Sequence, residues 1–126
     1  MQSSQWLAHT SNKTKNMRHV SIALAKYLVN EGVTPFIKIE NEDDIFGVAP
    51  IVSFELQSDP IGEVGVNGVQ VLDMLKYVKY LFESLNQAYP CRENALTITK
   101  IEEAIHWQDA RTKDRQKRLV EGQNKI

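Results

Sequence analysis

Two long helical patterns separated by a proline, in residues 69–119, constrain the fold more than any other feature of the sequence. In residues 69–87, apolar side chains recur every three or four positions, at Val71, Leu75, Val78, Phe82 and Leu85. This repeat predicts an amphipathic helix, and Pro90 ends it. Residues 93–119 carry a second apolar face, at Leu96, Ile98, Ile101 and Ile105. Two helices joined by so short a link predict a helical hairpin over residues 69–119.

The segments before the hairpin predict one more helix and a small sheet. Residues 17–30 place apolar side chains at helical spacing, and Gly32 follows as a stop signal. Residues 36–40 and 51–56 are β-branched and aromatic, which is typical of strands. The prediction is an α+β fold with a small antiparallel sheet, an N-terminal helix and a long C-terminal helical hairpin. We expect residues 1–126 to form a single domain, with residues 1–15 as a flexible arm.

Two loops each allow a functional and a structural interpretation. Residues 40–44 form an acidic turn between the strands, but their spacing misses the EF-hand pattern, which favours a solvated hairpin tip over a cation site. Residues 58–68 hold three glycines and a proline. Asn67 and Gly68 favour a turn there, and a close backbone approach to a ligand is the alternative.

Charge and cysteine content limit the classes of function. The net charge is −1, but residues 111–126 hold six of the 15 Lys and Arg residues and only two of the 16 Asp and Glu residues. Positive charge is therefore concentrated at the C-terminal end. Cys91 is the only cysteine, so no intrachain disulfide can form. With no apolar run of roughly 20 residues, we expect no membrane partner and a place in the cytoplasm.

Residues able to do acid–base or metal chemistry are scattered along the sequence. The three histidines share no metal-binding spacing with one another or with Cys91. Glu102 and Glu103 are adjacent on a helix, so their carboxylates diverge by about 100°. We therefore expect no enzyme activity, no catalytic residue, no metal site and no cofactor.

The basic C-terminal helix is the most suggestive feature. Arg111, Arg115 and Arg118 share one helix face, and guanidinium groups match the geometry of phosphate oxygens. The plainer interpretation is a solvated helix end, where positive charge also suits the helix dipole. Aromatic rings on or beside the hairpin could stack on a base, although each could equally be a core residue: Phe82, Tyr89 and Trp107.

Three stretches of the sequence resemble a known family. The run CRENALTITKIEEAIHWQDARTKDR (91–115) resembles the hairpin domain shared by phage Thoeris anti-defence and anti-CBASS sponge proteins. The upstream GEVGVNGVQVLDML (62–75) and the ending VEGQNK (120–125) are similar to the Thoeris branch. The resemblance implies a protein that binds cyclic ADP-ribose isomers made by bacterial TIR-domain enzymes and holds them intact. It also implies dimers or hexamers, and in some members a separate site for cyclic oligonucleotides.

The resemblance also suggests which residues bind the ligand. Arg111 and Arg115 match the arginine-rich ending of the family's second helix, and we assign them to phosphate. Asn94, in the CREN turn, is assigned to base or ribose, and Arg92 to phosphate or the dimer contact. Phe82 is the expected stacking ring. Because a sponge needs roughly nanomolar affinity, about −12 kcal/mol, the pocket is expected to lie between two protomers, where a small ligand can be enclosed.

Two alternatives from other classes remain. A phosphodiesterase cleaving the same signals would need acid and base groups from Glu102, Glu103 and His106. A small nucleic-acid-binding protein would use residues 111–118, although the overall charge argues against binding polymeric DNA or RNA.

Overall fold

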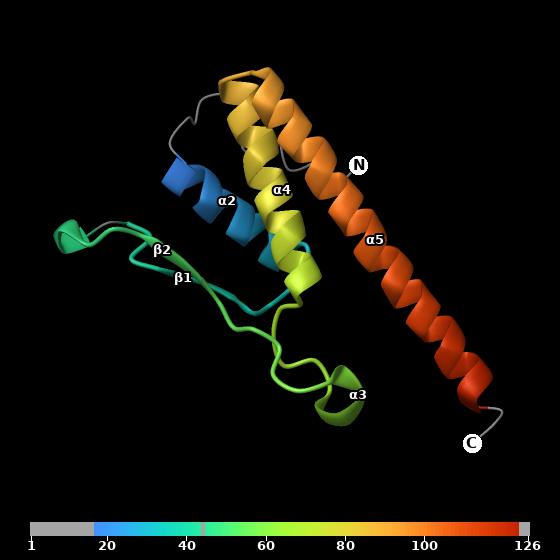
Figure 1. The fold of residues 1–126 in the computed structure, drawn as a ribbon. Coiled ribbons are helices and arrows are strands. Elements are labelled where there is room, and N and C mark those ends of the chain that lie inside the picture. The colour runs from blue at the N-terminus through green and yellow to red at the C-terminus, as the bar shows by residue number, and fades with distance from the viewer. Residues whose placement is uncertain (1–16, 44, 124–126) are drawn as a thin grey trace.

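The computed structural model describes residues 17–43 and 45–123, so the predicted arm at residues 1–15 lies outside the described residues. Helices and strands alternate in the N-terminal half, and two long helices follow (Figure 1). In chain order, the elements are α2 (Met17–Asn30), β1 (Ile37–Glu40), the 3-10 turn η1 (Ile45–Gly47), β2 (Ile51–Phe54), α3 (Ile61–Val64), α4 (Val71–Ala88) and α5 (Arg92–Gln123). This arrangement confirms the predicted α+β fold class.

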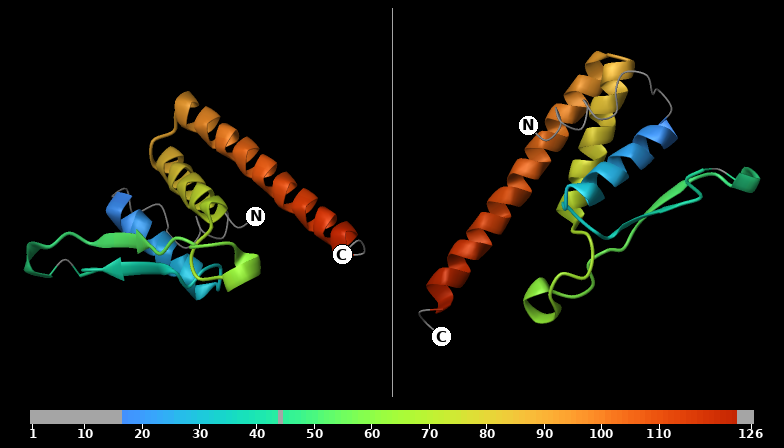
Figure 2. Two further views of the ribbon diagram at one scale, coloured as in Figure 1. Left: turned by 60° about the horizontal axis from the view of Figure 1, so that its bottom comes forward. Right: turned by 180° about the vertical axis from the view of Figure 1, so that it is seen from behind.

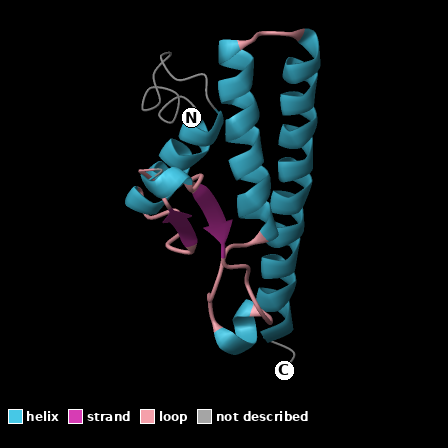
Figure 3. Ribbon diagram, turned by 90° about the vertical axis from the view of Figure 1, so that its left-hand side faces the viewer, coloured by secondary structure: helices cyan, strands magenta, loops and turns pink. Residues whose placement is uncertain are grey.

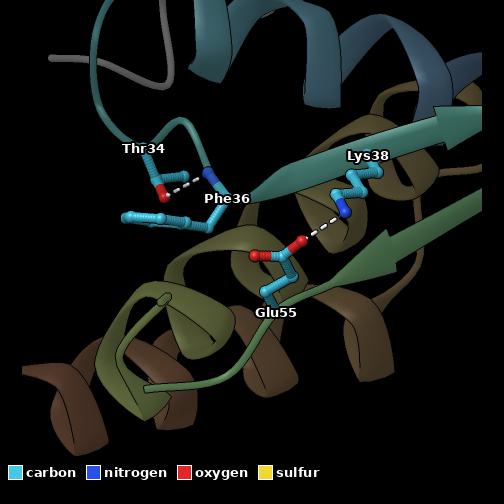
Figure 4. A network of polar contacts seen from close by, with 4 residues as sticks. All are labelled: Thr34, Phe36, Lys38 and Glu55. Atoms are coloured by element: carbon cyan, nitrogen blue, oxygen red, sulfur yellow. Dashed lines mark hydrogen bonds and ion pairs between the residues drawn. The ribbon is translucent and has the colours of Figure 1, made fainter. Parts of the chain in front are cut away.

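The sheet of the described chain is a two-stranded antiparallel hairpin. β1 and β2 pair with Ile37 opposite Phe54 and Glu40 opposite Ile51. Beside this pairing, Lys38 forms an ion pair with Glu55, and its hydrogen bond to that carboxylate raises the pKa of Lys38 (Figure 4). The side-chain oxygen of Thr34 accepts a hydrogen bond from the Phe36 N–H at 3.2 Å, which fixes the entry into β1.

The core lies where α2 meets the sheet and α4. α2 contacts both neighbours (Figure 2). Its buried face follows the predicted helical spacing, with Val20, Leu24, Ala25, Tyr27 and Leu28 all in the core cluster. Gly32 ends the helix in the left-handed region, with φ of 74°, and the Val33 N–H returns to the Leu28 carbonyl at 2.9 Å.

α4 buries a different face from the one expected. Tyr77 and Tyr80 point into the core, whereas Val71 and Val78 of the predicted apolar stripe are 76% and 38% exposed. Tyr77 donates a hydrogen bond to the Ser21 carbonyl at 2.9 Å and packs edge-on against Phe54. The amphiphilic tyrosines therefore attach the hairpin to the rest of the fold, and much of the aliphatic stripe remains accessible.

The glycine-rich segment before α4 is a closed structural corner. The Asn67 side chain accepts a hydrogen bond from the Ser58 N–H and donates one to the Ser58 carbonyl, each at 2.9 Å. Leu56 and Val69 form a parallel bridge, and a Cβ on Gly68 would lie 2.4–2.5 Å from backbone atoms of residues 55–57. Gly68 therefore permits a close approach of backbone to backbone, which is the structural interpretation of this segment.

The two helices of the hairpin differ greatly in length. Lys79 on α4 pairs with Glu102 on α5 at 3.4 Å, so these two residues lie at the same level of the hairpin. The two helices run antiparallel and rise equally per residue, so Val71, eight residues before Lys79, lies level with about residue 110 of α5, eight residues after Glu102. Residues 111–123 therefore continue beyond α4 as an unsupported overhang (Figures 1 and 3). Within the described chain, none of the helices is both long and apolar enough to cross a membrane.

Candidate functional site

The overhang of α5 presents a row of cations to solvent. All side chains from residue 111 to residue 119 are exposed. Arg118 is occupied by an ion pair with Asp114 at 3.2 Å. Arg111 and Arg115 have no hydrogen-bond or ion-pair partner among the residues that the structure describes. These two guanidinium groups, one helical turn apart, are therefore available to bind an anion from outside this chain.

Arg92 and Asn94 lie at the opposite end of α5, in its first turn. The Asn94 side chain donates a hydrogen bond to the Tyr89 carbonyl at 3.3 Å, and its backbone N–H points to the Cys91 sulfur at 3.4 Å. Asn86, which sequence reasoning did not single out, accepts a hydrogen bond from the Cys91 N–H at 3.1 Å. The turn is thus held by short-range polar contacts, and Arg92 is exposed beside it.

Phe82 lies near the turn end of the hairpin, not near the overhang. It is half-buried on α4, three residues after Lys79, and so lies level with about residue 99 of α5. Along the helix axis, Phe82 is therefore roughly 18 Å from Arg111, and Arg92 is roughly 28 Å from it. One chain gathers Phe82, Arg92 and Asn94 at one end of the hairpin, and Arg111 and Arg115 at the other.

A shallow, open hollow of about 340 Å³ lies on the outer surface of α5. It is lined by Thr99, Glu102, Glu103, His106 and Trp107. Glu102 pairs with Lys79, and Glu103 pairs with Lys100 at 3.7 Å. Trp107 is 69% exposed, and His106 lies edge-on to it, with 5.8 Å between the ring centres. The hollow therefore offers a flat ring and ion-paired carboxylates.

A more enclosed cavity, about 80 Å³, lies in the core between α2, the sheet and α4. Tyr77 and Tyr80 line it, and burial raises the pKa of both phenols. It is too small for a nucleotide. Over residues 17–43 and 45–123, no cluster of three or more His, Cys, Asp or Glu side chains could hold a metal ion.

Comparison with known proteins identifies the hairpin. Residues 52–113 match the Acb2/Tad1 hairpin domain, a stretch that runs from β2 through most of α5. Over these residues the chain is similar to the Acb2/Tad1 hairpin family. It is also similar to "Thoeris anti-defense 1" of Bacillus phage SBSphiJ7, with 41% identity over 80 residues. These findings confirm the family resemblance predicted from the CREN run and its neighbours.

The extent of these matches shows which candidate residues belong to the shared hairpin. Phe82, Arg92, Asn94 and Arg111 lie within the Acb2/Tad1 hairpin match, and Arg115 follows two residues after its end. The alignment with the Bacillus phage protein covers 63% of this chain and 55% of that protein, so the chain spans about half the length of the curated relative. No solved structure matches the chain.

Proposed function

We propose that this protein is a phage anti-defence sponge, which binds a cyclic ADP-ribose-type signal of bacterial Thoeris defence and holds it without cleaving it. The match of residues 52–113 to the Acb2/Tad1 hairpin domain and the similarity to a Thoeris anti-defense protein support the biological role. In this proposal, the protein acts in the cytoplasm of the host bacterium, where the signal is made. Binding of CBASS cyclic oligonucleotides at a further site is a second activity to test.

The pair of exposed arginines on the α5 overhang, which have no partner among the described residues, is the observation that carries the proposal. An arginine left without a partner on a bare helix does little for the fold, because exposed charges contribute little to stability. Two guanidinium groups one turn apart match the spread of oxygens on a pyrophosphate. Arg111 and Arg115 are therefore the proposed phosphate ligands.

The separation of the candidate residues supports a site shared by two chains. Arg111 and Asn94 lie roughly 26 Å apart along α5, which is farther than a single small nucleotide reaches. If α5 helices of two copies run antiparallel, the turn of one lies beside the overhang of the other. Phe82, Arg92 and Asn94 of one chain would then face Arg111 and Arg115 of its partner, in a symmetric dimer with two equivalent pockets.

Such a site would bind its ligand without chemistry. A sponge needs donors, a ring and enclosure, but no activated nucleophile or general base. The acids that a phosphodiesterase would use, Glu102 and Glu103, are paired with lysines in an open hollow. General acid–base catalysis would instead favour groups shielded from water.

Calorimetric titration with cyclic ADP-ribose isomers and a panel of cyclic di- and trinucleotides tests the proposal. The expected result is nanomolar binding of at least one cyclic ADP-ribose isomer and recovery of unchanged ligand after heating. Arg111→Ala should weaken binding by about tenfold or more, because a hydrogen bond to a charged group contributes about 1.5–3 kcal/mol. Lys113→Ala is the matched control, since it removes the same charge from another face of the overhang.

The other outcomes separate the alternatives. Recovery of an altered ligand would show an enzyme in place of a sponge. Binding of DNA or RNA polymers that weakens steeply with salt would favour a nucleic-acid-binding protein. Equal loss of binding in Arg111→Ala and Lys113→Ala would show that general positive charge, not this arginine pair, holds the ligand.

A further inference from the structure

The corner between β2 and α4 contains the one Asn–Gly pair of the sequence, Asn67–Gly68. Asparagine is among the chemically labile residues of proteins. It is most labile before glycine, because no Cβ obstructs attack by the glycine backbone nitrogen on the asparagine side chain. Asn67 is exposed to water, whereas Gly68 is buried against the facing backbone. A labile pair therefore lies where the helical hairpin joins the sheet.

The folded corner holds the Asn67 amide in place. Its oxygen accepts a hydrogen bond from the Ser58 N–H, and its nitrogen donates one to the Ser58 carbonyl, each at 2.9 Å. The Asn67 N–H donates to the side-chain oxygen of Gln57, also at 2.9 Å. An amide fixed on both sides cannot turn freely toward the Gly68 nitrogen, so the closed corner slows the attack.

The attacking nitrogen is held as firmly as the amide. A Cβ on Gly68 would lie 2.4 Å from the carbonyl carbon of Leu56, and the next N–H, of Val69, bonds to the Glu55 carbonyl at 2.7 Å. These contacts leave no room for alanine at this position, so the corner keeps the glycine that makes the pair labile. Stability of the amide therefore depends on the corner remaining closed.

We propose that Asn67 is a modification site, at which spontaneous deamidation makes an opening of the corner permanent. The Gly68 nitrogen forms a bond to the side-chain carbonyl carbon of Asn67 and gives up its proton. The bond between that carbon and the amide nitrogen breaks, and ammonia leaves with the proton. Water then opens the resulting succinimide at either carbonyl, which produces aspartate or isoaspartate at position 67.

Either product is incompatible with the closed corner. A carboxylate only accepts hydrogen bonds, so it cannot donate to the Ser58 carbonyl, and the two oxygens repel each other there. Isoaspartate also adds one atom to the backbone directly before Gly68, where the chain is already in close contact. The modified corner therefore loses the contacts that join β2 to α4.

Peptide mapping by mass spectrometry measures the deamidation of Asn67 in the whole protein at mildly alkaline pH. A synthetic peptide of residues 62–72 gives the rate without the fold. In the folded protein, Asn67 should react at least about tenfold more slowly than in the peptide, because reaction waits for local opening. Urea, added to both samples, should remove the difference. Asn41, which is exposed but precedes Glu42, is the internal control and should remain an amide.

Two pairs of variants test the role of the corner. Gln57→Ala removes the acceptor of the Asn67 N–H and should speed deamidation about fivefold or more. Glu63→Ala, which shortens an exposed side chain of the same segment, should keep the parent rate. Asn67→Asp carries the product side chain and should unfold at a lower temperature than the parent. Asn41→Asp makes the same change in an exposed turn and should unfold close to the parent temperature.

Three outcomes would contradict the proposal. Equal rates in the folded protein and the peptide would show that the corner gives no protection. An unreactive Asn67 in the peptide would show that the pair is not labile, and an Asn67→Asp variant as stable as the parent would show that the product fits the corner. If Gln57→Ala fails to fold, the comparison of parent and peptide still decides. All of these measurements are made without ligand, so they are independent of the proposed sponge function.

Discussion

Tyr77 connects the hairpin to the N-terminal half of the fold through its hydroxyl group. The hydroxyl donates to the Ser21 carbonyl at 2.9 Å and also bonds with the Ser21 side chain, while the ring packs against Phe54. Burial is the larger influence on the phenol and raises its pKa, whereas the hydrogen bond with Ser21 opposes that shift. The neutral phenol is thus the form that the folded state holds.

This pKa shift predicts a loss of stability at alkaline pH. Because the folded pKa of Tyr77 is raised, its contribution is complete below about pH 10, the pKa of an unfolded tyrosine, and falls as pH rises above it. Tyr77→Phe should lower the free energy of unfolding by about 1 kcal/mol at neutral pH. The variant should also lose less stability than the parent between about pH 8 and about pH 10.5. Urea unfolding at each pH measures both effects.

Tyr89→Phe is the control for this pH experiment, since Tyr89 is 55% exposed. Its alkaline stability profile should follow that of the parent protein. If Tyr77→Phe also follows the parent profile, burial of the Tyr77 phenol is not the source of the pH dependence.

At the same scale, the sequence predicts the proximity of the two arginines better than the exposure of the aromatic rings. Helical spacing alone places Arg111 and Arg115 on one face, so their proximity could be predicted without a structure. The exposure of Trp107 could not, because an aromatic residue in an amphipathic helix is as compatible with a core as with a surface. Only the position of α4, which leaves that face of α5 uncovered, distinguishes the two.

Among the elements, the corner between β2 and α4 sets where the hairpin begins. Leu56 bridges to Val69, and the Val69 N–H bonds to the Glu55 carbonyl at 2.7 Å. Gly68 lies so close to the facing backbone that a side chain has no room. The corner therefore depends on the absence of a Cβ at this position, not on a special backbone angle.

Gly68→Ala is expected to destabilise the fold by about 2 kcal/mol or more, because backbone must move to admit the methyl group. Gly62→Ala is the matched control, since a Cβ at Gly62 meets nothing within 4 Å. That variant should be neutral or slightly stabilising, because alanine favours helix over glycine. Thermal unfolding of both variants checks the prediction, and equal midpoints would show that the corner opens without cost.

The elements themselves were largely predictable, and the packing of α4 was not. The spacing of apolar residues and the glycine and proline stop signals predicted α2, both strands and the two long helices to within a few residues of their observed bounds. The apolar stripe on α4 suggested a buried aliphatic face, yet Tyr77 and Tyr80 occupy the core. Tyrosine has a large apolar ring and a polar tip, so a hydropathy pattern does not reveal that it will be buried.

At the scale of the whole molecule, many apolar side chains remain uncovered in the single chain. Val71 is 76% exposed, and four more exposed apolar residues precede it in the corner and α3: Leu56, Ile61, Val64 and Val66. Exposed apolar surface of this extent is typical of protein–protein contacts. It agrees with the proposed dimer, in which a second copy would cover part of this surface and complete each ligand site.

A hybrid dimer tests whether each site takes residues from both chains. Asn94→Ala and Arg111→Ala are co-expressed with different tags, and the dimer carrying one chain of each is isolated by two affinity steps. In a shared site, one pocket of this hybrid carries both substitutions and the other carries neither. The hybrid should then bind one cyclic ADP-ribose-type ligand per dimer with nearly the parent affinity, whereas each variant alone binds weakly.

If instead each site lay within one chain, both pockets of the hybrid would be defective and tight binding would be absent. Calorimetric stoichiometry distinguishes the two arrangements, and a mass corresponding to a single chain would contradict the dimer itself.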